Sequence, residues 1–213
     1  MAPFHRRKKP PDGKPPGWYK GCLRIDFECR CAYCLIHERD YQTHESFQID
    51  HFKPRSRFPE LERTYSNLYY SCQLCNKRNR KGDHWPTQAE ISAGSRFVDP
   101  CAEDWEEHIA FQRTGQVEPV TKAGQYSITT LELNRPQLVK YRLKNPAEYG
   151  ARSLLHKIGG QLNRIAKLAS QTQQNELITR VRQLWETLRG IRKQVEKKWN
   201  EKRPTYPSPV CPY

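Results

Sequence analysis

The sequence predicts an α+β fold, in which a cysteine-rich body of short strands and helices precedes a helical C-terminal region. Two Cys-x-x-Cys pairs stand at Cys31–Cys34 and Cys72–Cys75, with 37 residues between them. Between the pairs, residues 47–52 read as a strand, because prolines break any helix that could follow. Beyond residue 150, apolar residues recur at steps of three and four, which is typical of packed helices.

Composition sets the first limits on function. The chain has 213 residues, enough for one domain with an appendage or for two small domains. Its 5 Trp, 11 Tyr and 7 Phe are too many aromatic residues for a disordered chain. No apolar run approaches the ~20 residues of a membrane span, and the basic, proline-rich start lacks the apolar stretch of a signal peptide. We therefore expect a cytoplasmic protein that contacts no membrane.

The charge points to an anionic partner. Lys and Arg number 37 against 23 Asp and Glu, so the formal net charge is +14. An excess of this size indicates nucleic acid most often, although an ordinary basic protein would show it too. Residues 1–18 form a basic, proline-rich arm, which we expect to be extended and mobile until it meets a partner.

Eight cysteines in a chain without a secretion signal are expected to stay reduced, because a reducing cytosol disfavours disulfides. Four of them, Cys31, Cys34, Cys72 and Cys75, predict a structural zinc site, since two Cys-x-x-Cys pairs supply four thiolate ligands. Buried apolar cysteines and a redox-active pair are the alternatives. The other four cysteines have no matching partner spacing, although Cys29 lies close enough to the first pair to replace one ligand.

The expected elements of the body are short. Residues 19–27 read as a strand or turn, and residues 54–65 as a loop that contains two prolines. The remaining expected elements are helices near 65–68 and 72–80, helical character over 103–111, a hairpin of 116–119 with 125–129, and a helix opening at 134–136 with Pro136 in its first position.

The C-terminal region is expected to be a helical hairpin. One apolar seam runs from Leu155 to Ala169 and a second from Leu177 to Val195, with a polar turn between them. A coiled-coil contact with a second chain is the alternative. Residues 151–203 carry 13 Lys or Arg against 4 Glu, so the exposed faces are basic. The expected divisions of the chain are the arm 1–18, a zinc-stabilised domain with its connector 19–135, a helical region 136–203 and a proline-rich tail 204–213.

Between the cysteine pairs lie residues suited to metal-assisted hydrolysis. Asp50 offers a hard oxygen ligand for Mg²⁺ or Mn²⁺, and Asn76 can add its amide oxygen. His51 can take a proton from water near neutral pH. Neighbouring residues of a strand point to opposite faces, so Asp50 and His51 serve one site only if the chain bends there. Asn67 cannot act as a base, but its amide can orient a loop or a histidine, or cap the next helix.

The stretch 31–86 resembles the HNH endonucleases, through Asp50-His51, Asn67-Leu68 and Cys75-Asn76 framed by the two cysteine pairs. The resemblance implies a ββα-metal core that cleaves phosphodiester bonds. It implies that His51 is the general base and that Asp50 and Asn76 hold the divalent metal. Asn67 would position the loop and the base, and the four cysteines would hold zinc outside the catalytic centre.

Further motifs are similar to those of a bacterial HNH subgroup, namely Ile49-Asp-His-Phe-Lys-Pro54, Phe97-Val-Asp-Pro100 and Leu131-Glu-Leu-Asn-Arg135. This subgroup includes effectors of Septu-type and retron-linked phage-defence systems, which pair with an ATPase subunit. The resemblance therefore implies the nuclease subunit of an anti-phage complex. The sequence departs from the pattern at Asn76, where histidine is usual, and at Asn79, where lysine is usual.

Basic residues around the motif are expected to contact DNA phosphates, because such contacts supply much of the affinity for nucleic acid. They are Lys53, Arg55, Arg57, Lys77, Arg78, Arg80 and Lys81. No sequence-reading module is evident, so base specificity is not expected. His84 is expected to be a solvated loop histidine, with a contact to DNA or metal as the alternative. The alternative function for the whole chain is a zinc-stabilised nucleic-acid-binding module without cleavage.

Overall fold

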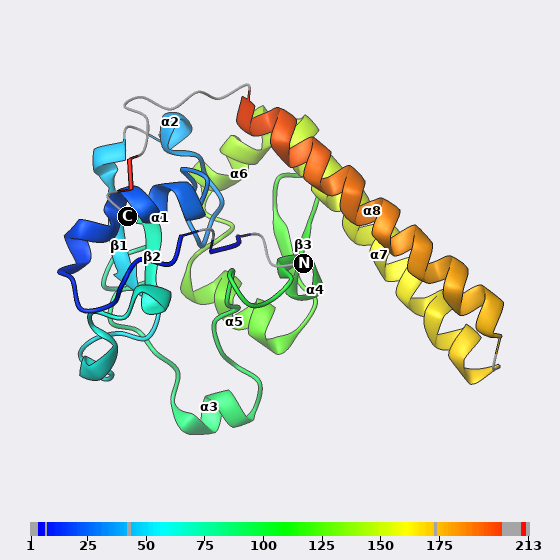
Figure 1. The fold of residues 1–213 in the computed structure, drawn as a ribbon, viewed down its shortest axis with the longest axis horizontal. Coiled ribbons are helices and arrows are strands. Elements are labelled where there is room, and N and C mark those ends of the chain that lie inside the picture. The colour runs from blue at the N-terminus through cyan, green and yellow to red at the C-terminus, as the bar shows by residue number, and fades with distance from the viewer. Residues whose placement is uncertain (1–3, 7, 42–43, 173, 202–209, 212–213) are drawn as a thin grey trace.

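The computed structural model describes residues 4–6, 8–41, 44–172, 174–201 and 210–211. A body of short helices and two small sheets carries a long helical arm (Figure 1). The strands are β1 (Phe47–His51), β2 (Leu68–Cys72), β3 (Ile109–Phe111) and β4 (Val117–Pro119). The helices are α1 (Lys20–Asp26), α2 (Glu38–Tyr41), α3 (Gln88–Ser92), α4 (Trp105–His108), α5 (Lys122–Thr130), α6 (Pro136–Lys144), α7 (Pro146–Gln171) and α8 (Asn175–Glu201). The expected mixed fold is confirmed.

The first sheet is the antiparallel pair β1–β2, which confirms the expected strand. Phe47 lies opposite Cys72, and His51 lies opposite Leu68. All five residues of β2 are buried. Helix α1 packs against this strand, and the Ala32 N–H donates to the Tyr70 carbonyl at 2.8 Å along its other edge. The backbone of β2 is therefore covered by β1 on one edge and by the first cysteine loop on the other.

Residues 19–27 form a 3-10 turn and helix α1, which corrects the expected strand or turn. Four fully buried residues of this segment lie three, one and four positions apart; they are Tyr19, Cys22, Leu23 and Phe27. That spacing places them on one face of a helix. Burial of this apolar face against β2 explains why the segment is helical.

The N-terminal arm is packed onto the body, contrary to the expected mobile segment. Phe4 is buried, and its ring lies 4.9 Å from the ring of Phe27. The Arg6 guanidinium lies 4.8 to 5.1 Å from the ring centroids of Phe27, Tyr65 and Tyr69. These apolar and cation–π contacts hold the described part of the arm in place. Residues 1–3 and 7 lie outside the described part of the chain.

Two expected helices near the motif are replaced by tighter structure. Residues Tyr65–Asn67 form a single 3-10 turn before β2, and residues 73–83 form a succession of turns and bends. The N–H groups of Cys75 and Asn76 both donate to the Cys72 carbonyl, at 3.0 and 3.1 Å. This tight turn points the two thiols of the second pair toward one place, which an extended helix would not do.

The connector contains a second sheet with a partner that the sequence did not predict. Strand β4 pairs with β3, and residues 122–130 form helix α5, so the expected hairpin of 116–119 with 125–129 is wrong. The Thr121 hydroxyl accepts the Gly124 N–H at 3.1 Å and starts this helix. Within the helical stretch expected over 103–111, residues 105–108 form helix α4 and residues 109–111 form β3. Helix α6 begins at Pro136, as expected.

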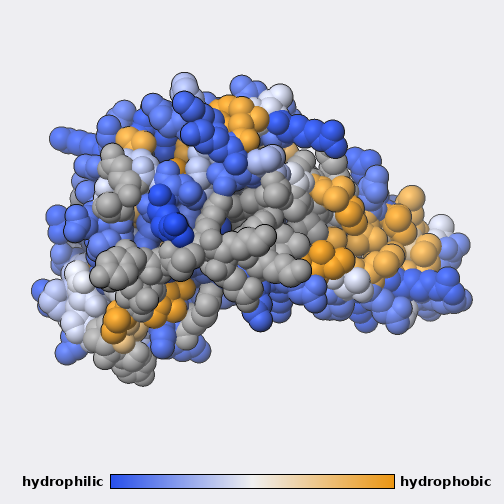
Figure 2. Space-filling view, turned by 90° about the horizontal axis from the view of Figure 1, so that it is seen from above, coloured by the Kyte–Doolittle hydropathy of each residue, from blue (hydrophilic) through white to orange (hydrophobic). Residues whose placement is uncertain are grey.

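Helices α7 and α8 pack along each other as the expected antiparallel hairpin (Figure 1). A Cβ built on Gly159 would lie 2.9 Å from the Trp185 ring, so this glycine permits close packing of the two helices. Large apolar side chains remain exposed on the arm (Figure 2); they are Leu154, Ile165, Leu168, Leu184 and Ile191. Within the described residues, every helix is too short or too polar to span a membrane.

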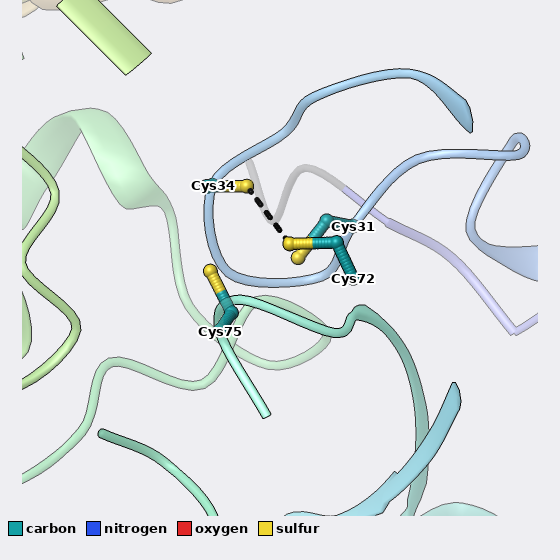
Figure 3. Close-up of side chains that lie close together, drawn as sticks. All are labelled: Cys31, Cys34, Cys72 and Cys75. Atoms are coloured by element: carbon teal, nitrogen blue, oxygen red, sulfur yellow. Dashed lines mark hydrogen bonds between the residues drawn. The ribbon is translucent and has the colours of Figure 1, made fainter. Parts of the chain in front are cut away.

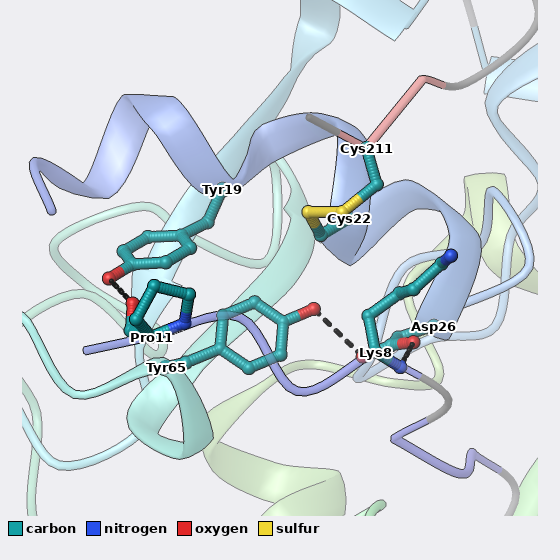
Figure 4. Close-up of a disulfide and its surroundings, with 7 residues drawn as sticks. All are labelled: Lys8, Pro11, Tyr19, Cys22, Asp26, Tyr65 and Cys211. Atoms are coloured by element: carbon teal, nitrogen blue, oxygen red, sulfur yellow. Dashed lines mark hydrogen bonds between the residues drawn. A yellow bond between two sulfur atoms is a disulfide. The ribbon is translucent and has the colours of Figure 1, made fainter. Parts of the chain in front are cut away.

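A disulfide joins Cys22 of α1 to Cys211 near the C-terminus (Figure 4). For Cys22 and Cys211, this bond corrects the expectation that the cysteines stay reduced. A Cβ on Gly21 would lie 1.6 Å from the Val210 carbonyl oxygen, so the described tail residues lie directly against α1. The rest of the expected proline-rich tail, residues 204–209 and 212–213, lies outside the described residues.

The packing of α5 on α4 gives a testable prediction. A Cβ on Gly124 would lie 1.9 Å from the His108 carbonyl oxygen, so Gly124→Ala should lower the free energy of unfolding by about 1–3 kcal/mol. Gly160→Ala is the matched control, because a Cβ at this helical glycine of α7 meets no atom within 4 Å. It should raise the stability of its helix by roughly 1 kcal/mol. Urea unfolding of both variants checks this, and equal midpoints would contradict the packing of α5.

Candidate active site and metal centre

Four cysteine side chains converge in the body (Figure 3). They are Cys31 and Cys34 from the loop before α2, Cys72 at the end of β2 and Cys75 in the following turn. Their sulfur atoms all lie within 4.8 Å of one another, and all four residues are buried. A tetrahedral zinc ion with bonds of about 2.3 Å needs sulfur atoms about 3.8 Å apart, and the Cys34 and Cys72 sulfurs are separated by 3.8 Å. The cluster therefore fits zinc, and Cys29 is not part of it.

Local backbone structure aims the first cysteine pair. The Leu35 N–H donates to the Cys31 carbonyl at 3.0 Å, and the Cys31 N–H donates to the Ile36 carbonyl at 2.9 Å. Leu35 has a φ of 62°, which turns the chain back on itself. The pair is thus held in a tight loop that matches the turn around the second pair.

The four thiols lie close enough to shift one another's pKa values. Burial raises the pKa of Cys31, but hydrogen bonds from the neighbouring thiols outweigh burial and lower this pKa well below its usual value. Hydrogen bonding to Cys31 and Cys34 raises the pKa values of Cys72 and Cys75. The Cys31 thiolate is therefore favoured over those of Cys72 and Cys75. Zinc binding ionises all four thiols and releases their protons.

His51, the last residue of β1, is half-buried and oriented by a backbone carbonyl. Its Nε2 atom lies 2.9 Å from the Glu62 carbonyl oxygen. A carbonyl can only accept a hydrogen bond, so Nε2 carries the hydrogen and Nδ1 carries the lone pair. The imidazole is thereby held in the tautomer that can accept a proton at Nδ1.

Asn67 fastens the loop between β1 and β2. Its Oδ1 accepts the Lys53 N–H at 2.8 Å, and its Nδ2 donates to the carbonyls of Lys53 at 3.0 Å and Leu61 at 3.3 Å. Leu61 directly precedes Glu62, so this buried amide fixes the segment whose carbonyl orients His51. A strand follows Asn67, so the alternative in which it caps a helix is wrong.

Asp50 faces away from His51. Both residues lie in regular strand pairing, opposite Tyr69 and Leu68, so the bend that would bring their side chains to one face is not formed. The buried Asp50 carboxylate accepts a hydrogen bond from the Tyr33 hydroxyl through Oδ2, and the same oxygen lies 3.6 Å from Lys81 Nζ. Burial raises the pKa of Asp50, and Lys81 and the Tyr33 hydrogen bond oppose that rise.

Lys81 is a buried structural cation, which corrects its expected place on a DNA-binding surface. Its side chain is 0% exposed, and Nζ donates to the His51 carbonyl at 3.1 Å. Burial lowers the pKa of Lys81, and the Asp50 carboxylate raises it. A buried ammonium needs a charged partner, and this one cannot reach a phosphate. Three aromatic rings surround it at 5.3 to 6.0 Å, those of Phe52, Trp85 and Phe97.

Asn76 lies beside the same face of β1 as Asp50. Its Nδ2 donates to Gln48 Oε1 at 3.0 Å, and Gln48 and Asp50 are two strand residues, or about 7 Å, apart on one face. The contacts described for Asp50 and Asn76 use neither Asp50 Oδ1 nor the Asn76 amide oxygen. Two such oxygen atoms suit Mg²⁺ or Mn²⁺. Asp50 is buried, however, and Lys81 already offsets the charge of its carboxylate.

Most of the other basic residues around the motif are exposed. They are Lys53, Arg55, Arg57, Lys77 and Arg78. Arg80 is an exception, because its guanidinium donates to Glu132 at 2.5 Å and to the Leu74 carbonyl at 2.7 Å, and its side chain is only 11% exposed. The expected phosphate-contacting set thus loses Arg80 and Lys81. His84 is exposed, and its Nε2 lies 2.7 Å from the Tyr126 hydroxyl.

Sequence reasoning missed three contributors to the site. Tyr33 lies inside the first Cys-x-x-Cys loop, and its position there was the available signal that it faces the motif. Arg135 donates from Nη2 to the Cys75 sulfur at 3.3 Å. The sequence signal that could have found it is the subgroup motif of residues 131–135, which ends in this arginine. Glu62 contributes a backbone carbonyl, which leaves no trace in a residue pattern.

Comparisons with known proteins agree with this arrangement. The family model described as HNH endonuclease matches residues 31–82. The chain is 28% identical to "Septu protein PtuB" of Bacillus mycoides (strain KBAB4), over 59% of this chain and 50% of that protein. The chain therefore spans about half the length of this curated relative. Residues 31–82, which hold the cysteine cluster and the β1–β2 pair, thus match the HNH endonuclease family, in a chain that is similar to a Septu protein.

Proposed function

We propose that this protein is a metal-dependent HNH endonuclease that hydrolyses phosphodiester bonds of DNA. The observation that carries the proposal is His51, whose Nε2 is fixed by the Glu62 carbonyl and whose Nδ1 can accept a proton. A module that only binds nucleic acid needs no imidazole held in one tautomer. The match of residues 31–82 to the HNH endonuclease family supports the same reaction class.

His51 takes a proton from water at Nδ1, and the water oxygen attacks phosphorus. The bond from phosphorus to the leaving sugar oxygen breaks, and that oxygen takes a proton from solvent. A divalent cation would stabilise charge on the phosphate and on the leaving oxygen. Asp50 and Asn76 would hold this cation beside His51 once the end of β1 bends, because regular pairing places Asp50 and His51 on opposite faces. Asn67 acts through the loop, because it holds the segment whose carbonyl orients His51.

The charge favours a nucleic acid as the substrate, and we propose that this nucleic acid is DNA. The exposed residues Lys53, Arg55, Arg57, Lys77 and Arg78 lie in the segments that follow β1 and β2, and the whole chain carries a net charge of +14. Contacts to phosphates alone bind DNA without regard to sequence. We therefore propose cleavage that is not specific for a base sequence.

We further propose that the protein is the nuclease subunit of a bacterial anti-phage complex with an ATPase partner. The support is its similarity to a Septu protein and the subgroup motifs of the sequence. The helical arm is the proposed docking element, because it exposes apolar side chains that include Leu168 and Leu184. A cytoplasmic location stays a prediction.

A zinc-stabilised nucleic-acid-binding module without cleavage is the second candidate. The observation that favours it is the ion pair of Asp50 with Lys81. The lysine ammonium already neutralises the carboxylate that was expected to bind the metal. Both candidates share the cysteine cluster and the basic surface. They differ in whether the protein cuts DNA when Mg²⁺ or Mn²⁺ is supplied.

Replacement of the proposed base separates the two candidates. His51→Ala should reduce nicking of supercoiled plasmid in Mg²⁺ by about 10²- to 10⁴-fold. DNA binding and the melting temperature should change little, because affinity comes from the dispersed basic residues. His84→Ala is the control, since this exposed histidine contacts Tyr126 outside the motif. Equal nicking by His51→Ala and wild type would remove His51 from the mechanism, and a wild type that never nicks would favour the binding module.

Loss of one thiolate should empty the cysteine cluster. Wild-type protein should contain about one zinc per chain by mass spectrometry, and Cys72→Ser should lose zinc and several kcal/mol of stability, because binding and folding are coupled. Cys101→Ser is the control, because Cys101 is free and lies outside the cluster. Folded, carefully purified wild type without zinc would refute this prediction.

The arm can be tested without truncation. Leu168→Ser with Leu184→Ser should abolish co-purification with the partner and leave plasmid nicking intact, since both side chains are more than half exposed. Leu143→Ser, an exposed leucine of α6, should have no effect. If the arm grips DNA instead, Lys167→Gln with Lys193→Gln should reduce the salt slope of DNA binding by about 2, because fewer counterions are released. An unchanged complex in the leucine variant would place docking elsewhere.

A further inference from the structure

The zinc site poses a charge problem that its four ligands do not solve. A zinc ion with four thiolates carries a net charge of −2, and all four cysteines are buried. Burying net charge is costly unless it is paired or hydrogen-bonded. Donors outside the ligand set commonly tune such sites. The inference below rests on the zinc site of the proposed function.

Arg135 lies where such a donor is needed. This buried guanidinium donates from Nη2 to the Cys75 sulfur at 3.3 Å. Its Nη1 donates to the carbonyls of Leu131 at 2.9 Å and Glu132 at 3.3 Å, at the end of α5. Its Nε is buried and makes no hydrogen bond among the described residues. A fixed positive charge thus touches the cluster directly.

The turn 131–135 holds this arginine rigidly. Leu131 and Leu133 are buried in the core, and Asn134 clamps Val117 by accepting its N–H at 2.7 Å and donating to its carbonyl at 2.8 Å. Glu132 has a φ of 48°, a left-handed conformation in which its carboxylate pairs with Arg80. Each residue of the stretch therefore has a contact that keeps the turn in place.

We propose that Arg135 is a positioning residue of the zinc centre, which offsets the charge of the four thiolates through Cys75 and joins the cluster to the connector helices. Charge-assisted hydrogen bonds are the strong ones, and a donor on one sulfur stabilises that thiolate against protonation and attack. Arg135 thereby slows metal loss at Cys75 in particular.

The test uses full-length, zinc-loaded protein. Zinc release to the coloured chelator 4-(2-pyridylazo)resorcinol should be about 10- to 100-fold faster in Arg135→Gln than in wild type. In Arg135→Gln, limited alkylation with iodoacetamide, read by peptide mass spectrometry, should modify Cys75 before the other three ligands. Arg135→Lys should restore release to within about tenfold of wild type, because it keeps the charge but not the planar fork.

Arg142→Gln is the matched control. Arg142 is also buried, lies two helical turns further on, and donates to the Gly115 carbonyl at 2.9 Å instead of to a sulfur. Its replacement should leave the order of alkylation unchanged. If Arg135→Gln releases zinc like Arg142→Gln and its four ligands are alkylated together, Arg135 is only a structural residue and the proposal fails.

Failure of this proposal can be told apart from failure of the proposed function, because zinc content and plasmid nicking are measured separately. Wild type without zinc refutes the zinc site itself, while plasmid nicking reports separately on His51. If Arg135→Gln does not fold, Arg135→Lys decides the matter. Wild-type order of alkylation with release within about tenfold supports the charge role. Faster release with even alkylation overturns it.

Discussion

Four sulfur atoms within 4.8 Å of one another hold together two segments that 37 residues separate in the sequence. The whole β1–β2 unit lies inside this loop, so the cluster fixes where the unit begins and ends. It also sets the neighbours of the motif, because Tyr33 stands in the first cysteine loop and reaches Asp50. The body has an apolar core, and a buried tetrathiolate centre adds a constraint to it, because metal binding is coupled to folding.

His51 is held from two sides by polar groups that the protein buries. Inside the body, Lys81 donates to the His51 carbonyl and pairs with Asp50. On the loop side, Asn67 holds the segment that carries the Glu62 carbonyl. Burying these groups is costly unless each finds a partner, and each of them does. These contacts fix the backbone of His51 and the tautomer of its imidazole, and His51 is the residue proposed to do the chemistry.

Local patterns predicted the parts of the molecule that local forces determine. The strand over 47–52, the helix that begins at Pro136 and the helical hairpin follow from turn residues and apolar periodicity. The cysteine cluster followed from spacing, because four thiols at this spacing have few other uses. The errors arose where distant contacts override local preference. Residues 73–83 are bent by the convergence of sulfurs, and β4 takes β3 as its partner while the capped segment after Thr121 becomes a helix. Lys81 looked like a surface residue in a basic run, and only its three-dimensional neighbours show that it is buried.

The bond between Cys22 and Cys211 gives the chain the topology of a lariat. The helical arm is not a free extension, because the covalent path that leaves the body at α7 returns to the body at α1. A protease that cuts the arm once would therefore leave its two halves attached until a reductant is added. A C-terminal truncation that removes the arm also removes Cys211 and frees the Cys22 thiol. Surface substitutions, unlike deletions, leave this ring closed.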